Sequence, residues 1–147
     1  MRVPHNSVVL VADGRKMLFL RNTGDADYPN LEVINAAEQP GRYDRDFKTD
    51  APGRAFQSFG SARSAMEEVD FQRQEEDRFA ADAAAMLKRH AMDGDYDSLI
   101  VVAPPRTLGA LRKCYHREVT DRLKAELPKD LTGHPVNAIG RILIETE

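Results

Sequence analysis

Four arginines are the residues whose types and positions most clearly suggest chemistry in this chain. Arg54 and Arg63 lie in a glycine-containing segment, and Arg106 and Arg112 follow a proline pair on a stretch with helical spacing. Guanidinium groups pair with phosphate oxygens, and backbone amides beside glycines can form a concave anion site. We therefore interpret all four as candidate contacts for an anion or RNA, although the glycine before Arg54 is more simply explained by a turn.

The segment 41–66 around Arg54 supplies a second group of candidate contact residues. It contains glycines, arginines and aromatic side chains, but no helical or alternating period lasts more than a few residues. Aromatic rings beside basic residues can stack on bases or pack on a protein. Because its length far exceeds the usual ~4–6 residues, the sequence predicts a loop that is either functional or disordered. The candidate loop contacts are Gly53, Phe56, Gln57, Ser58 and Phe59.

Catalytic and metal chemistry find less support in the residue pattern. The four histidines are far apart and form no His-x-x-x-His pair, so we expect no metal site and no cofactor. Neither a nucleophile elbow nor a phosphate-binding glycine motif is present. Cys114 is interpreted as a small packed residue, and Asp13 as a hairpin-turn residue rather than a nuclease-like acid. We expect no catalytic residue; the alternative is a hydrolase of an ester or phosphodiester that uses Gln57, Ser58 or Arg54.

Length and composition limit the class of protein. The chain has 147 residues, of which 41% are hydrophobic and 31% charged, and this fits a single domain over 1–147 with one core. The longest apolar run near the N-terminus, Val8 to Ala12, is too short for a signal peptide or a membrane-spanning helix. We therefore expect a cytoplasmic protein without a membrane partner. The single cysteine excludes an internal disulfide.

The net charge of −3 conceals an uneven distribution. Residues 67–97 hold four basic against ten acidic side chains, a net charge of −6. Residues 104–124 hold six basic against two acidic side chains, a net +4, and residues 41–66 hold five against three, a net +2. A basic face beside a basic loop favours an anionic partner such as RNA. A solvated helix face that the acidic helix balances internally is the plainer interpretation.

The elements that must position these residues follow from apolar periodicity. Two apolar runs, the first of them β-branched, are separated by Asp13-Gly14 and predict a hairpin with a type I′ turn, and a third strand completes an antiparallel meander. Gly109, costly inside a helix, is interpreted as a sign of close packing against a strand. Alternating strands and helices give an α/β domain with a mixed sheet and packed helices. The predicted strands are 7–12, 16–21, 31–35, 99–103 (buried on both faces) and 124–131 (at an edge, because of Pro128), and the predicted helices are 71–92, 107–116 and a short one after Pro135.

Several short motifs run in order along nearly the whole chain. The most specific are Pro52-Gly53-Arg54 and Ala103-Pro104-Pro105-Arg106, and others are Val11-Ala12-Asp13-Gly14-Arg15, Glu75-Glu76-Asp77-Arg78-Phe79-Ala80 and Lys129-Asp130-Leu131-Thr132. Together they resemble the bacterial host attachment protein family ("protein required for attachment to host cells"). That family is similar in turn to the central domain of archaeal and eukaryotic class I peptide-chain release factors. The resemblance implies a ribonuclease H-like sandwich with a long loop between the third strand and the first helix.

The resemblance also bears on mechanism. In those release factors the long loop carries a Gly-Gly-Gln tip that enters the ribosomal peptidyl-transferase centre, whereas the loop here reads Ser58-Phe59-Gly60-Ser61-Ala62-Arg63. Relatives commonly have a histidine after the loop arginine, where this chain has Ser64. The leading hypothesis is a non-enzymatic binding module that contacts ribosome or RNA and affects attachment indirectly. The alternatives are the hydrolase and a protein-interaction module that uses Phe56 and Phe59.

Overall fold

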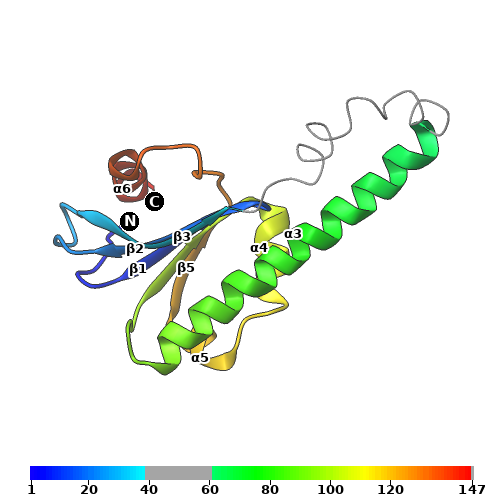
Figure 1. The fold of residues 1–147 in the computed structure, drawn as a ribbon. Coiled ribbons are helices and arrows are strands. Elements are labelled where there is room, and N and C mark those ends of the chain that lie inside the picture. Colours follow the sequence, from blue (N-terminus) through cyan, green and yellow to red (C-terminus); the bar gives the residue numbers. More distant parts are fainter. Residues whose placement is uncertain (39–60, 147) are drawn as a thin grey trace.

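The computed structural model describes residues 1–38 and 61–146, with side chains in the second range from residue 70 onward. Three strands come first, then a long helix, a strand, two short helices, a strand and a final helix (Figure 1). The strands are β1 (Val8–Ala12), β2 (Lys16–Asn22), β3 (Leu31–Glu38), β4 (Leu99–Val102) and β5 (Leu123–Leu127). The helices are α3 (Ser61–Met92), α4 (Pro105–Arg112), α5 (Arg117–Arg122) and α6 (Val136–Glu145).

The five strands form one mixed sheet in the order β3-β2-β1-β4-β5. The pairs β1–β2 and β2–β3 are antiparallel, as the predicted meander requires, and the pairs β1–β4 and β4–β5 are parallel. At the sheet edge, β5 ends at Leu127, shorter than the predicted 124–131, because Pro128 has no N–H to donate to a ladder. The predicted α/β class with a mixed sheet is confirmed.

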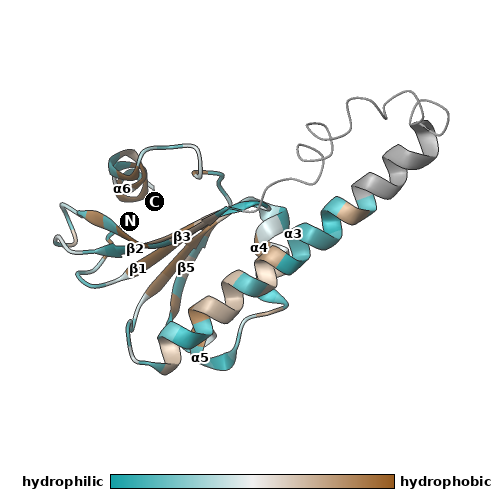
Figure 2. Cartoon of the chain, in the orientation of Figure 1, coloured by the Kyte–Doolittle hydropathy of each residue, from teal (hydrophilic) through white to brown (hydrophobic). Residues whose placement is uncertain are grey.

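Helices cover both faces of the sheet, so the domain has three layers (Figure 1). Alternation along β1 places Val8 and Leu10 in one apolar cluster, which α3 and α4 complete, and Val9 and Val11 in another, which α6 completes. Figure 2 shows this as strands coloured brown between helices that carry teal residues. The central strands β1 and β4 are buried along their whole length, as predicted for the 99–103 run.

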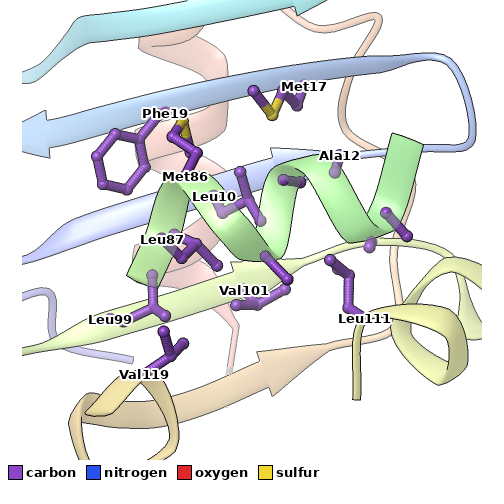
Figure 3. Packing of buried hydrophobic residues seen from close by; sticks show 14 of the residues in the cluster. Leu10, Ala12, Met17, Phe19, Met86, Leu87, Leu99, Val101, Leu111 and Val119 are labelled. Atoms are coloured by element: carbon purple, nitrogen blue, oxygen red, sulfur yellow. The ribbon is translucent and has the colours of Figure 1, made fainter. Parts of the chain in front are cut away.

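The larger cluster packs α3 across β1, β2 and β4 (Figure 3). The predicted inner face of the helix is confirmed: Phe79, Ala83, Met86 and Leu87 are buried there. His90, the last residue of that face, is half-buried, and its ring centroid lies 5.0 Å from that of Phe19 on β2. The apolar face on which the helix was predicted is therefore the surface that packs α3 against the sheet.

α3 begins at Ser61, ten residues before the predicted start, so the backbone at 61–66 is helical and the predicted loop was too long at that end. At about 1.5 Å per residue the 32-residue helix is about 48 Å long, and Figure 1 shows its N-terminal part extending beyond the sheet. A helical segment that faces no core carries no apolar stripe, and periodicity therefore cannot find its start.

The C-terminal end of α3 follows a Schellman pattern at Asp93-Gly94-Asp95. Gly94 has a φ of +75°, which its lack of Cβ permits. The Gly94 N–H donates to the Ala91 carbonyl at 3.0 Å, and the Asp95 N–H donates to the His90 carbonyl at 2.9 Å. These bonds satisfy two carbonyls of the last turn and direct the chain back into β4.

The hairpin between β1 and β2 is present, but its turn is not type I′. Among the described residues the positive φ angles occur at Asn6 and Gly94, not at Gly14 or Arg15. The Asp13 carboxylate instead accepts the N–H groups of Arg15 and Lys16, each at 2.7 Å. The predicted hairpin is confirmed, and the predicted turn conformation is wrong because the aspartate side chain holds the turn.

The segment after β4 departs most from prediction. α4 ends at Arg112, so Cys114 and His116 lie beyond it, and Cys114 is exposed rather than packed. His116 caps α5, its Nδ1 accepting the Glu118 N–H at 3.1 Å. A Cβ at Gly109 would meet no atom within 4 Å, so the interpretation of close packing at this glycine was wrong. α6 starts after Pro135, as predicted.

Tyr96 makes the stability of the fold sensitive to alkaline pH. Its hydroxyl is buried and donates to the Leu87 carbonyl at 2.9 Å. Burial raises the pKa of Tyr96 from 10.0 to about 12, against a smaller lowering by the Arg122 guanidinium. Above pH 10 the unfolded chain loses this proton while the folded chain keeps it. The contribution of this group to the free energy of unfolding is therefore fully present below pH 10. It is lost as the pH rises towards 12, and the loss amounts to about 2–3 kcal/mol.

We therefore expect the free energy of unfolding to fall less between pH 9.5 and pH 11.5 in Tyr96→Phe than in the wild type. Urea unfolding at a series of pH values measures this. Tyr28→Phe is the matched control, since the Tyr28 side chain is 81% exposed. An equal alkaline loss in wild type and Tyr96→Phe would show that this hydroxyl does not carry the effect.

Candidate functional site

The carboxyl ends of β1, β4 and β5 meet at one edge of the sheet, because these three strands run parallel. In such sheets ligands bind outside the carboxyl ends of the strands. Asp13 follows β1 there, Pro104 caps α4 after β4, and Asp130 follows β5. β3 also ends at this edge, since Glu38 pairs with Lys16 at the start of β2. The chain thus enters the segment 39–60 from the same place.

Hydrogen bonds join two of these segments. The side chain of Thr132, which is 6% exposed, lies between two carboxylates. Its Oγ1 is 2.8 Å from Asp13 Oδ2 and 2.9 Å from Asp130 Oδ1, so its hydroxyl can donate to either. Because a hydroxyl has one proton, it donates to one carboxylate at a time. The Asp13 Oδ1 atom accepts the two turn amides, so both of its oxygens have partners inside the fold.

An ion pair links α3 and α4 at the same edge. Arg106 Nη2 of α4 lies 3.4 Å from Glu76 Oε2 of α3. The Glu76 side chain runs over the hairpin turn: a Cβ added at Gly14 would lie 2.7 Å from Glu76 Cγ. The absence of a side chain at Gly14 therefore leaves room for the carboxylate that holds Arg106. The Arg106 side chain remains 57% exposed.

Arg112 is held at the other end of α4. Its Nε lies 3.1 and 3.2 Å from the two carboxylate oxygens of Glu126 on β5, and its side chain is 59% exposed. Beside this pair, burial raises the pKa of Tyr115, the Glu126 charge raises it further, and the Arg112 charge opposes the rise. Tyr115 is therefore neutral at ordinary pH and serves as packing beside the arginine.

The first turn of α4 offers backbone donors between these side chains. Pro105 is the first helical residue, where a missing N–H costs nothing, and no side chain caps the helix. The next amides of the turn have no carbonyl partner in the helix, and amides at such a position favour anions. α4 contains two arginines and no acidic residue.

The predicted contacts are brought together only in part. Arg54, Gly53, Phe56, Gln57, Ser58 and Phe59 lie outside the described residues, and Arg63 is described only as backbone of α3. Arg106 and Arg112 stand six residues apart on α4, about 9 Å along the axis, each with its own carboxylate. They form two separate points on one helix rather than one cluster.

Sequence reasoning did not single out Glu76, Asp130 and Thr132 as site residues. All three lie in motifs that carry the family resemblance, and this is the signal that could have found them. Charge counting placed Glu76 only within an acidic helix. In the structure Glu76 pairs with Arg106, so it directly balances one charge of the basic segment. Within the described ranges, no three His, Cys, Asp or Glu side chains are grouped so that they could hold a metal ion.

None of the described helices is long and apolar enough to cross a bilayer. A comparison with curated proteins finds no match. The family model for bacterial archaeo-eukaryotic release factor family 12 matches residues 6–143, which is nearly the whole chain and includes every described strand and helix except the last two residues of α6. This agrees with the release-factor-like part of the sequence resemblance and with the α/β sandwich. The chain therefore belongs to the bacterial archaeo-eukaryotic release factor family 12.

Proposed function

We propose that this protein is a non-enzymatic module that binds ribosomal RNA through the arginines of α4 and the segment 41–66. The observation that carries the proposal is the state of Arg106 and Arg112. Each is oriented by one carboxylate, yet each side chain is more than half exposed. An arginine held in place loses less side-chain freedom when it binds phosphate, and its remaining N–H donors stay available.

The position of α4 supports the same proposal. The helix starts at the edge where β3 runs into the segment 39–60, so Arg54 is connected to this edge through the chain. Membership of a release-factor-like family makes the ribosome the natural anionic partner. A ribosome-binding role implies a cytoplasmic location, and any effect on attachment to host cells would then be indirect.

We propose a non-enzymatic role because the carboxylates at the carboxyl edge of the sheet are already bonded within the fold. Asp13 accepts two amides and one hydroxyl, and Glu76 pairs with Arg106. Groups held in this way act as structural acceptors, whereas a general base needs a lone pair directed at a substrate. The loop sequence, which lacks the Gly-Gly-Gln tip, agrees with this assignment.

Co-sedimentation of the protein with purified ribosomes over a salt series tests the proposal. We expect binding at low salt that weakens as salt rises, because phosphate contacts release counterions. Arg112→Gln should weaken binding and reduce the slope of log affinity against log salt by about one.

Arg141→Gln is the matched control. It removes the same charge from an exposed position on α6, which covers the opposite face of the sheet from α4 (Figure 1). We expect this variant to bind like the wild type. No binding at low salt, or equal losses in Arg112→Gln and Arg141→Gln, would contradict a site on α4.

A further inference from the structure

The amino ends of β1 and β4, opposite the edge described above, border a cavity of about 400 Å³. Its wall comes from the N-terminal segment before β1, the end of β2, and the turn between α3 and β4. The volume lies within the range of roughly 300–1,000 Å³ that small-molecule sites occupy. Among the side chains that line the cavity are those of Ser7, Arg21, Asp97 and Ser98.

Two buried hydroxyls in this wall have no hydrogen-bond partner among the residues that the structure describes. Ser7 is 1% exposed, and neither Ser7 Oγ nor Ser98 Oγ makes a hydrogen bond with any of those residues. The two serines precede Val8 and Leu99, which pair across β1 and β4, so the hydroxyls belong to neighbouring strands. A buried hydroxyl without a partner destabilises the fold, and alanine at either position would avoid that loss.

Two charges of opposite sign line the same cavity without ion pairs. The Arg21 side chain is half-buried and makes no hydrogen bond or ion pair with any of the described residues, although Glu32 stands opposite it in the register. Asp97 is exposed and likewise has no ion pair within the described part of the chain. The neighbouring Asp95 differs, because its Oδ2 already lies 2.8 Å from His90 Nδ1.

We propose that this cavity binds a small zwitterion of the size of a free amino acid. Arg21 would pair with the ligand carboxylate and Asp97 with its ammonium, while a rotation about χ1 would turn Ser7 and Ser98 towards ligand oxygen or nitrogen atoms. A ligand with only one charge would leave either Arg21 or Asp97 unpaired. The proposal is independent of RNA binding, because this cavity and α4 arise from different ends of the strands.

Amide spectra of ¹⁵N-labelled protein, recorded during titration with free L-amino acids up to about 10 mM, test this proposal. Acetate and methylammonium serve as probes that carry one charge each. We expect saturable shifts at Ser7, Arg21 and Ser98 with at least one amino acid, and at least tenfold weaker binding of both single-charge probes. Shifts at Arg106 and Arg112 are not expected.

Variants separate a ligand site from a purely structural role. Arg21→Gln and Asp97→Asn should each weaken amino-acid binding about tenfold, with the cooperative unfolding transition retained. Ser98→Ala should weaken binding while leaving the melting temperature unchanged or raised, since it removes an unpaired hydroxyl. The absence of saturable shifts, acetate binding as tight as that of amino acids, or unchanged affinity in both charge variants would overturn the proposal.

Discussion

Replacing Asn22 by alanine should lower the free energy of unfolding by about 3–4 kcal/mol, among the largest losses for a polar side chain in this domain. Asn22 is fully buried at the end of β2. Its Nδ2 donates to the Val3 carbonyl at 2.8 Å and to the Asp25 carbonyl at 3.2 Å. Its Oδ1 accepts the N–H groups of Gly24 and Asn30, each at 2.9 Å.

These bonds explain the size of the effect. One side chain satisfies backbone groups of the N-terminal segment and of both sides of the β2–β3 turn. Alanine would leave those groups buried without partners, and each such group costs about 1–3 kcal/mol. Water entry and relaxation of the backbone would offset part of that cost. The turn has little freedom to relax, since a Cβ at Gly24 would lie 2.5 Å from the Tyr28 carbonyl oxygen.

Urea unfolding followed by circular dichroism measures the loss, and a total stability of about 5–15 kcal/mol is expected for a domain of this size. Asn137→Ala is the matched control, because Asn137 is exposed on α6 and alanine favours a helix. We expect the control to change stability by less than about 0.5 kcal/mol. An Asn22→Ala variant as stable as the control would refute the role assigned to these hydrogen bonds.

The sequence predicts the strands and helices of this fold where a buried face gives a run or a regular spacing of apolar residues. The apolar run from Leu99 is a central strand, and the spacing of Phe79, Ala83 and Met86 marks the buried face of α3. Where no core lies opposite, as at the N-terminal end of α3, the pattern carries no boundary and the start of the helix was misplaced. Burial thus made the fold class predictable, while exposed segments remained ambiguous.

Polar interactions inside the fold were much less predictable. The role of Asn22 depends on Val3 and Asn30, which only the three-dimensional arrangement places beside it. The same holds for Thr132, whose hydroxyl meets Asp13 across a separation of 119 residues. Such contacts depend on strand order, and composition or local spacing does not record that order.

The candidate anion contacts illustrate the same limit. Counting charges identified the basic segment that contains Arg106 and Arg112. It did not reveal that each arginine has its own carboxylate, Glu76 on α3 and Glu126 on β5. Each partner lies in a different element from the arginine it holds. The basic segment is consequently better described as two oriented arginines than as a uniform positive face.

The second large effect is expected at Phe19, where alanine should cost about 3–5 kcal/mol. Phe19 is fully buried on β2 beneath α3 (Figure 3). Its ring centroid lies 5.0 Å from that of His90 and 6.2 Å from that of Tyr96, the latter in an edge arrangement. Removing the ring would leave a cavity between the sheet and the end of α3, because elements on both sides hold the neighbouring side chains in place.

Phe19→Leu provides the graded comparison, since leucine fills most of the space and should cost less than half as much as alanine. Chemical denaturation gives both values, and an unchanged dependence on denaturant would show that the unfolding transition itself is preserved. Phe19 packs near the C-terminal end of α3, whereas Glu76 lies over three turns earlier in the same helix. Ribosome binding by folded Phe19→Leu should therefore match that of the wild type. A loss of binding in this variant would mean that α4 functions only when the whole of α3 is packed against the sheet.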